Sequence, residues 1–253
     1  MDFEPIESEP VALTPIVEAP TPEPFWGYTD LLLMIGFTVA AFIVIAVVTS
    51  AILWIFPAEK KNFAVWGLIL QTVFYILVYL GFRFTLGVRH GRPVMASLGW
   101  RRTHFSVVLA VAGGVALAFL VGLIAGLLHT PQVSTPIDLF TKSTFTLVLF
   151  AIFAAVIAPV TEELFFRGFL QPLFSRTFGV IAGILITALI FGGLHAPEYS
   201  WAWQYASAVA LAGAVFGWVR YRANSIIPST IMHGCYNSVF LIAFLVSKHP
   251  KLQ

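Results

Sequence analysis

Seven long apolar runs constrain this chain more than any other feature of its sequence. They cover residues Leu31–Phe56 and about 63–82, 105–128, 143–158, 179–195, 201–219 and 226–247. A helix of roughly 20 apolar residues crosses the hydrocarbon core of a bilayer. An eighth span arises if residues 161–178 form a membrane element of their own. The sequence therefore predicts an all-α, polytopic membrane helix bundle with seven or eight transmembrane helices.

Composition supports this fold class and excludes several others. The chain is 59% hydrophobic and 10% charged, whereas an average soluble domain is about 25% charged. It has one cysteine, so no internal disulfide can form. The net charge of +2 and the scattered basic residues argue against a nucleic-acid partner. We expect the lipid bilayer to be the main partner.

Charge is distributed unevenly along the chain. Residues 1–24 hold six acids and six prolines but no Lys or Arg, which predicts a disordered acidic N-terminal tail, assigned to residues 1–28. Residues 29–142 are expected to form N-terminal transmembrane helices. The loop between Arg83 and Arg102 contains five arginines, and the positive-inside bias places it, with the N-terminus, in the cytoplasm. We expect a multi-pass protein of a bacterial-type plasma membrane.

Three charged residues interrupt an apolar stretch at Glu162, Glu163 and Arg167. Ionisable groups at membrane depth are costly, so they indicate a functional site by default. Glu163 and Arg167 have i, i+4 spacing, which predicts a structural ion pair on one helix face. Glu162 lies about 100° around the helix and has Phe166 as its i+4 neighbour. We therefore expect Glu162 to be buried without a partner, as a candidate general base or acid.

Two further polar positions fall within later apolar runs. His195 ends the run FGGLHAP, and His233 shares a helix face with Asn237 in IMHGCYNSVF. With turns near residues 178–179 and 223–224, a rise of 1.5 Å per residue places Glu162 and His195 roughly 24 Å from the first turn. The other two side chains lie roughly 15–21 Å from the second turn. The four side chains are thus predicted to converge at similar depth.

These motifs, in this order, resemble those of the CPBP family, which comprises CAAX proteases and bacteriocin-processing enzymes and is also called the Abi family. The family pattern of EExxxR, FxxxH and HxxxN reads here as Glu162–Arg167, Phe191–His195 and His233–Asn237. All three motifs are intact. The resemblance covers roughly residues 143–247, which we assign as a CPBP/CAAX protease-like catalytic core.

The resemblance implies an intramembrane endopeptidase, similar to the type II CAAX prenyl endopeptidase, that acts on a membrane-associated protein or peptide. Carried over by motif, Glu162 and His195 activate water, while His233 and Asn237 donate to the oxyanion. Both donor groups are chemically suited to that role. No cofactor is required in this hypothesis. A site reached from the cytosol is implied, yet His195 lies near the end opposite Arg176, so these two expectations conflict.

Several alternatives remain open. Glu162, His195 and His233 could form a His₂Glu zinc site, although Asn237 is a poor zinc ligand and the HExxH motif is missing. A serine protease is disfavoured because the chain has no GxSxG motif, and Cys235 is interpreted as a packing residue. Outside the enzymes, a proton-coupled transporter would also carry membrane Glu and His, and a bacteriocin self-immunity scaffold needs no catalysis. The complete set of motif residues favours the peptidase.

Overall fold

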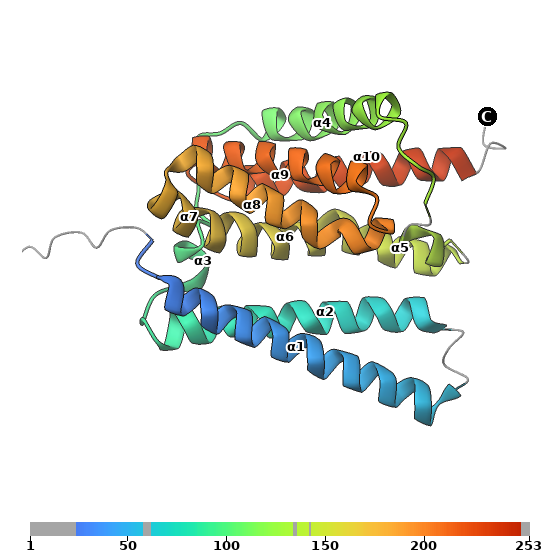
Figure 1. The fold of residues 1–253 in the computed structure, drawn as a ribbon, viewed down its shortest axis with the longest axis horizontal. Helices are drawn as coiled ribbons and strands as arrows, with labels where there is room; N and C mark the ends of the chain where they lie inside the picture. Colours follow the sequence, from blue (N-terminus) through green and yellow to red (C-terminus); the bar gives the residue numbers. More distant parts are fainter. Residues whose placement is uncertain (1–23, 58–61, 134–135, 142, 249–253) are drawn as a thin grey trace, which may run out of the picture.

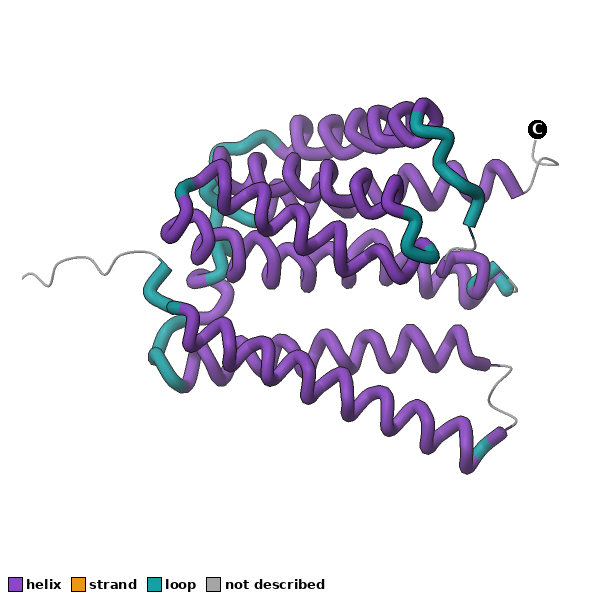
Figure 2. Tube along the Cα trace, in the orientation of Figure 1, coloured by secondary structure: helices purple, strands orange, loops and turns teal. Residues whose placement is uncertain are grey.

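The structure, a computed structural model, describes residues 24–57, 62–133, 136–141 and 143–248. Within these ranges every regular element is a helix and none is a strand (Figure 2). Six helical segments are long and apolar enough to cross a membrane. The all-α, polytopic fold predicted from the apolar runs is therefore confirmed, and the protein is a multi-pass integral membrane protein. The first 23 residues of the predicted tail lie outside the described part of the chain.

The helices follow one another as the apolar runs do, with short π-helical or 3₁₀ turns between some of them. Their bounds are α1 (Tyr28–Ile55), α2 (Phe63–Phe82), α3 (Val94–Ser97), α4 (Val107–Leu127), α5 (Thr144–Ile152), α6 (Ala158–Glu162), α7 (Gln171–Phe178), α8 (Val180–His195), α9 (Trp203–Ala223) and α10 (Ile227–Lys248).

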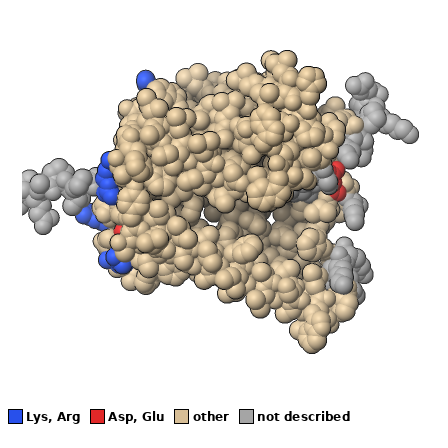
Figure 3. All heavy atoms as spheres, viewed as in Figure 1, with Lys and Arg blue, Asp and Glu red and all other residues tan. Residues whose placement is uncertain are grey.

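The bundle has two parts (Figure 1). Helices α1 and α2 form a hairpin that lies along one side of the remaining helices. In the larger part, α8 packs against α7 and α9, and α10 packs against α4 and α9. Figure 3 shows the surface hollowed between the hairpin and the larger part.

The predicted count of seven or eight spans is not confirmed, since six candidates are found among the described residues. The predicted span at about 201–219 corresponds to α9, but this helix is not among the six candidates. It is 21 residues long, yet it begins at Trp203-Gln204 and carries Arg220 and Arg222 in its last turn. These polar ends lower its mean hydropathy without preventing its burial between α8 and α10.

The last residues of the predicted tail, which was drawn to residue 28, pack against the bundle. Trp26 is only 3% exposed, its Nε1 donates to the carbonyl oxygen of Phe169 at 3.1 Å, and the two rings stack at 5.6 Å. Arg176 Nη2 also donates to the Trp26 carbonyl at 2.9 Å. An indole buries a large apolar area. The acidic and proline-rich composition of the preceding residues gave no indication of this packing.

One end of the bundle collects the arginines, as Figure 3 shows for the side in view. Asp30, in the first turn of α1, forms an ion pair with Arg89 at 3.3 Å and accepts a hydrogen bond from His90 at 2.9 Å. Arg101 donates to the side chain of Asn224 at 2.6 Å. The start of α1, the loop after α2 and the α9–α10 turn therefore share one end, in the grouping that the positive-inside argument requires.

The fold makes a direct prediction about Trp26. Replacing it with Ala should lower the free energy of unfolding by about 3–5 kcal/mol, because a buried aromatic side chain is removed. Thermal unfolding of the purified protein in detergent measures this loss. Trp54→Ala is the matched control, since Trp54 is 83% exposed; equal effects of both changes would contradict the packing role.

Candidate active site

The EExxxR motif lies in a helix that is repeatedly interrupted by wider turns. The segment Thr144–Phe178 forms one candidate membrane span. It contains π-helical stretches at Phe153–Ile157 and Glu163–Leu170. It ends at Gly179, whose φ of +86° favours glycine. Such π-helical turns occur frequently at functional sites. Here they set the directions of the two glutamates and of the backbone that faces α10.

Glu163 and Arg167 form an ion pair in the core. Glu163 Oε1 lies 3.1 Å from Arg167 Nη1, and both side chains are fully buried. Arg167 Nη2 donates to the carbonyl oxygen of Gly213 on α9 at 2.9 Å. A buried pair is stable only when further contacts offset the loss of hydration, and this pair has them.

Phe191, the first residue of the FxxxH motif, joins the separate parts of the site. The Arg167 guanidinium carbon lies 4.4 Å from the centre of its ring, within the range of a cation–π interaction. The Phe191 ring also lies 4.5 Å from the His195 ring and 5.8 Å from the His233 ring. The motif phenylalanine thus contacts both candidate catalytic histidines.

His233 lies between the two glutamates. Its Nδ1 is 3.2 Å from Glu163 Oε1, and its Nε2 is 3.7 Å from Glu162 Oε2. Phe216 stacks on the imidazole at 4.6 Å, which fixes the plane of the ring. The sequence predicted Glu163 only as the partner of Arg167. In the structure Glu163 also orients His233.

This contact determines what His233 can donate. A carboxylate oxygen can only accept, so Nδ1 carries a proton and donates to Glu163. A neutral ring then has a bare Nε2, whereas the imidazolium carries N–H groups on both sides. A neutral His233 with its proton on Nδ1 thus has no N–H on Nε2 to donate to an oxyanion.

Glu162 has partners, contrary to the expectation of an unpaired carboxylate. Its Oε2 faces His233, and its Oε1 accepts from the hydroxyl of Tyr75 on α2 at 3.2 Å. The side chain is 17% exposed. Spacing along the sequence predicts neighbours on the same helix only. Both partners of Glu162 come from other helices.

Asn237 faces the π-helical stretch Phe153–Ile157. Its Nδ2 donates to the carbonyl oxygen of Ala154 at 2.9 Å. One turn earlier on α10, Gly234 allows close contact, because a Cβ there would overlap the carbonyl oxygen of Ala155. An amide carries two N–H groups, so the bond to Ala154 orients Asn237 and leaves a second N–H.

His195 ends α8 and is oriented by the backbone. Its Nδ1 lies 2.7 Å from the carbonyl oxygen of Phe191. The carbonyl can only accept, so the proton is on Nδ1 and the neutral ring presents Nε2 as an acceptor. Glu162 and His195 make no direct ion pair in the part of the chain that the structure describes. Glu198, in the following 3₁₀ turn, is close enough to interact electrostatically with both.

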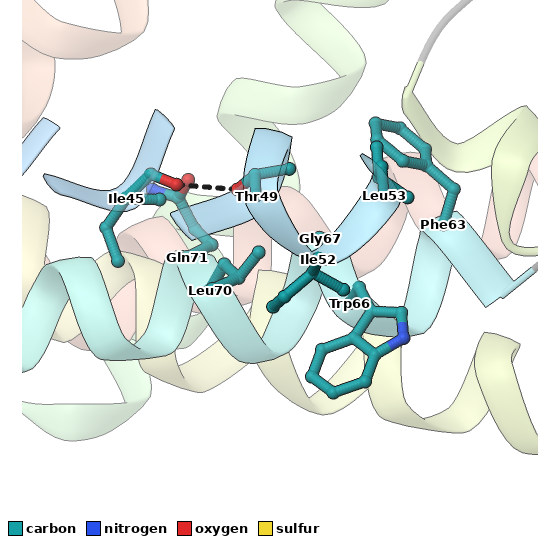
Figure 4. A pocket seen from close by; sticks show the side chains of 9 residues that line it. All are labelled: Ile45, Thr49, Ile52, Leu53, Phe63, Trp66, Gly67, Leu70 and Gln71. Carbon is teal, nitrogen blue, oxygen red and sulfur yellow. Dashed lines mark hydrogen bonds between the residues drawn. The ribbon is translucent and has the colours of Figure 1, made fainter. Parts of the chain in front are cut away.

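Two cavities lie away from these residues. A cavity of about 170 Å³ between α1 and α2 is lined by Ile45, Thr49 and Gln71, among others (Figure 4). A second, of about 860 Å³, lies at the arginine-rich end and is lined by Arg92, Arg101, Arg176 and Arg220 together with uncharged residues. Neither is lined by Glu162, His195, His233 or Asn237. Neither of these two cavities is therefore part of the candidate site.

The zinc alternative requires three ligands directed at one point. Among the described residues, no group of three or more His, Cys, Asp or Glu side chains is arranged to hold a metal ion. Glu162 Oε2 and His233 Nε2 lie 3.7 Å apart, but His195 does not join them in a group that could hold a metal ion. The residues as placed therefore do not fit the His₂Glu site.

Comparison with known proteins agrees with the motifs. A family model described as "Type II CAAX prenyl endopeptidase Rce1-like" matches residues 143–239. No curated protein and no solved structure matches the chain. The resemblance to the CAAX protease family is confirmed, and the chain carries an Rce1-like protease domain over these residues.

Two contacts of the site were missed by the sequence argument. Tyr75 lies in an apolar run far from the motifs, and an aromatic residue there carries no signal for function. The link from Glu163 to His233 depends on the close packing of α10 against the broken helix. A sequence signal for this packing exists in Gly234, the small residue directly after His233.

The shared contact of Glu163 predicts a large effect on stability. Glu163→Gln should lower the free energy of unfolding by about 3–5 kcal/mol, since Arg167 would lose its charged partner in the core. Glu162→Gln is the matched control and should change stability little, because that side chain is partly exposed. Thermal unfolding in detergent measures both. A stable Glu163→Gln protein would show that the buried pair is not a structural requirement.

Proposed function

We propose that the protein is an intramembrane endopeptidase that hydrolyses a peptide bond of a membrane-associated protein or peptide with an activated water. The observation that carries the proposal is the position of His233, within reach of both motif glutamates. It brings the first and third motifs of a protease family to one point, and Phe191 of the second motif packs against the same imidazole. The family match over residues 143–239 supports this class of activity.

Glu162 and His195 are proposed to activate the water. Glu162 is partly exposed, and its Oε2 can accept one water proton. Nε2 of His195 is an acceptor, because Nδ1 donates to Phe191, and can accept a hydrogen bond from the second water hydrogen. A water held by both groups would direct its oxygen lone pair at the carbonyl carbon of the scissile bond.

His233 and Asn237 are proposed to stabilise the oxyanion. Attack by the water converts the carbonyl oxygen into an oxyanion, which needs N–H donors at fixed positions. The second N–H of Asn237 and Nε2–H of a protonated His233 supply them. Both side chains are held by their other contacts, to Ala154 and to Glu163. Pre-oriented donors lower the barrier because they do not reorganise during the reaction.

The remaining step returns the proton. As the tetrahedral intermediate collapses, the carbon–nitrogen bond breaks and Glu162 gives its proton to the leaving amine. Hydrolysis thus yields a free amine and a new carboxyl group, which keeps the second water hydrogen until it ionises in solution, and the carboxylate of Glu162 is regenerated. These steps use side chains of the chain and water, with no required metal.

The substrate is proposed to be the C-terminal region of a lipid-anchored protein or a membrane-associated peptide. The six candidate spans hold the site within an apolar bundle, so a substrate that partitions into the bilayer would reach it most readily. A farnesylated CAAX peptide and its unprenylated counterpart, offered in vesicles, separate a need for the lipid from recognition of the peptide. Membrane-protein termini in cells with the wild type and with Glu162→Ala would identify natural substrates.

Glu162→Gln is expected to abolish peptide hydrolysis while the protein remains folded. The amide keeps the shape of the side chain but is a much weaker proton acceptor. Release of a fluorescent C-terminal fragment in vesicles measures the rate, and thermal unfolding verifies the fold. An active Glu162→Gln protein would overturn the assignment of the general base.

Asn237→Ala is expected to lower kcat by about 10²–10³-fold while KM changes little, because an oxyanion donor acts in the transition state. Ser238→Ala, on the same helix, is a suitable control; its hydroxyl donates to the carbonyl of Gly234. Metal analysis of the active protein accompanies the kinetics. One zinc per chain, with activity lost on chelation and restored by zinc, would replace this mechanism with a metal-dependent one.

A further inference from the structure

Tyr75 connects the N-terminal hairpin to the candidate active site. It lies in α2, outside the segment that matches the protease family. Its hydroxyl donates to Glu162 Oε1 at 3.2 Å. The nearest residue of the matched segment is 68 positions further along the chain, since the match begins at residue 143. Only the tertiary fold brings the two groups together.

The position of the Tyr75 ring is fixed by a second contact. It stacks on the ring of Phe153 at a centroid distance of 5.6 Å and an interplanar angle of 7°. Phe153 opens the π-helical stretch that also supplies the carbonyl to which Asn237 donates. The same wide turn therefore supports two candidate site contacts, one on α2 and one on α10.

The hydrogen bond gives the two oxygens of Glu162 different roles. Oε1 is occupied by the tyrosine hydroxyl, and Oε2 is directed toward His233. A carboxylate that rotated freely would present either oxygen to a water. A hydroxyl fixed by its ring stack removes this freedom, as a pre-organised site requires.

We propose that Tyr75 is a positioning residue for the general base, and that the α1–α2 hairpin completes the active site by holding Glu162 Oε2 toward the reacting water. This inference rests on the proposed function. It assigns a role in the reaction to a helix outside the protease domain match.

The test is the kinetics of Tyr75→Phe in the full-length protein. This change removes the hydroxyl and keeps the ring that stacks on Phe153. We expect kcat to fall about tenfold, equivalent to about 1.4 kcal/mol in the barrier, with KM within about twofold and little change in thermal stability. Tyr79→Phe is the matched control, because Tyr79 is one turn later on α2 and 38% exposed; its kcat should not change.

A double-mutant cycle separates positioning from a structural role. In a Glu162→Asp background the shorter carboxylate moves away from the tyrosine, so adding Tyr75→Phe should cause little further loss of kcat. The inference would be overturned if the kcat losses of Tyr75→Phe and Glu162→Asp were fully additive. It would also be overturned if Tyr75→Phe alone left kcat unchanged. An inactive wild-type protein would instead refute the proposed function. Phe153→Leu, which removes the stack and keeps the hydroxyl, should lower kcat less than Tyr75→Phe.

Discussion

The shared contact at Glu163 Oε1 is the interaction on which the rest of the site depends. This one oxygen lies 3.1 Å from Arg167 Nη1 and 3.2 Å from His233 Nδ1. A carboxylate in an apolar bundle is stable only with charged or hydrogen-bonding partners, so α10 must approach the broken helix closely. The approach places His233 beside Glu162 as well. The requirement to neutralise a buried charge thus also builds the arrangement proposed for catalysis.

Close helix contact makes this arrangement possible, and small residues and wide turns allow it. Gly234 lets α10 lie against the π-helical stretch Phe153–Ile157, and Gly192 lets α8 lie against α9, where a Cβ would overlap the carbonyl oxygen of Ala206. Without a hydrophobic driving force between helices in lipid, such packing and hydrogen bonding hold a bundle together. The residues next to the motifs are therefore part of the site's construction.

The α1–α2 hairpin has a role beyond anchoring the protein. Trp26 fixes its beginning to Phe169, and Tyr75 joins its second helix to Glu162. One contact supports stability and the other supports the proposed reaction. The family match covers residues 143–239 and includes neither residue.

The sequence by itself determined the all-α membrane fold, the turns near residues 179 and 224, the i, i+4 pair of Glu163 and Arg167, and the family resemblance of the three motifs. These follow from hydropathy and helical spacing, which are local properties of the chain. Only the tertiary structure decided that Glu162 has Tyr75 and His233 as partners, that Glu163 orients His233, and that Trp26 is buried. Each of these depends on which face of one helix meets another. That choice is set by packing between distant segments, for which an apolar sequence offers many nearly equal alternatives.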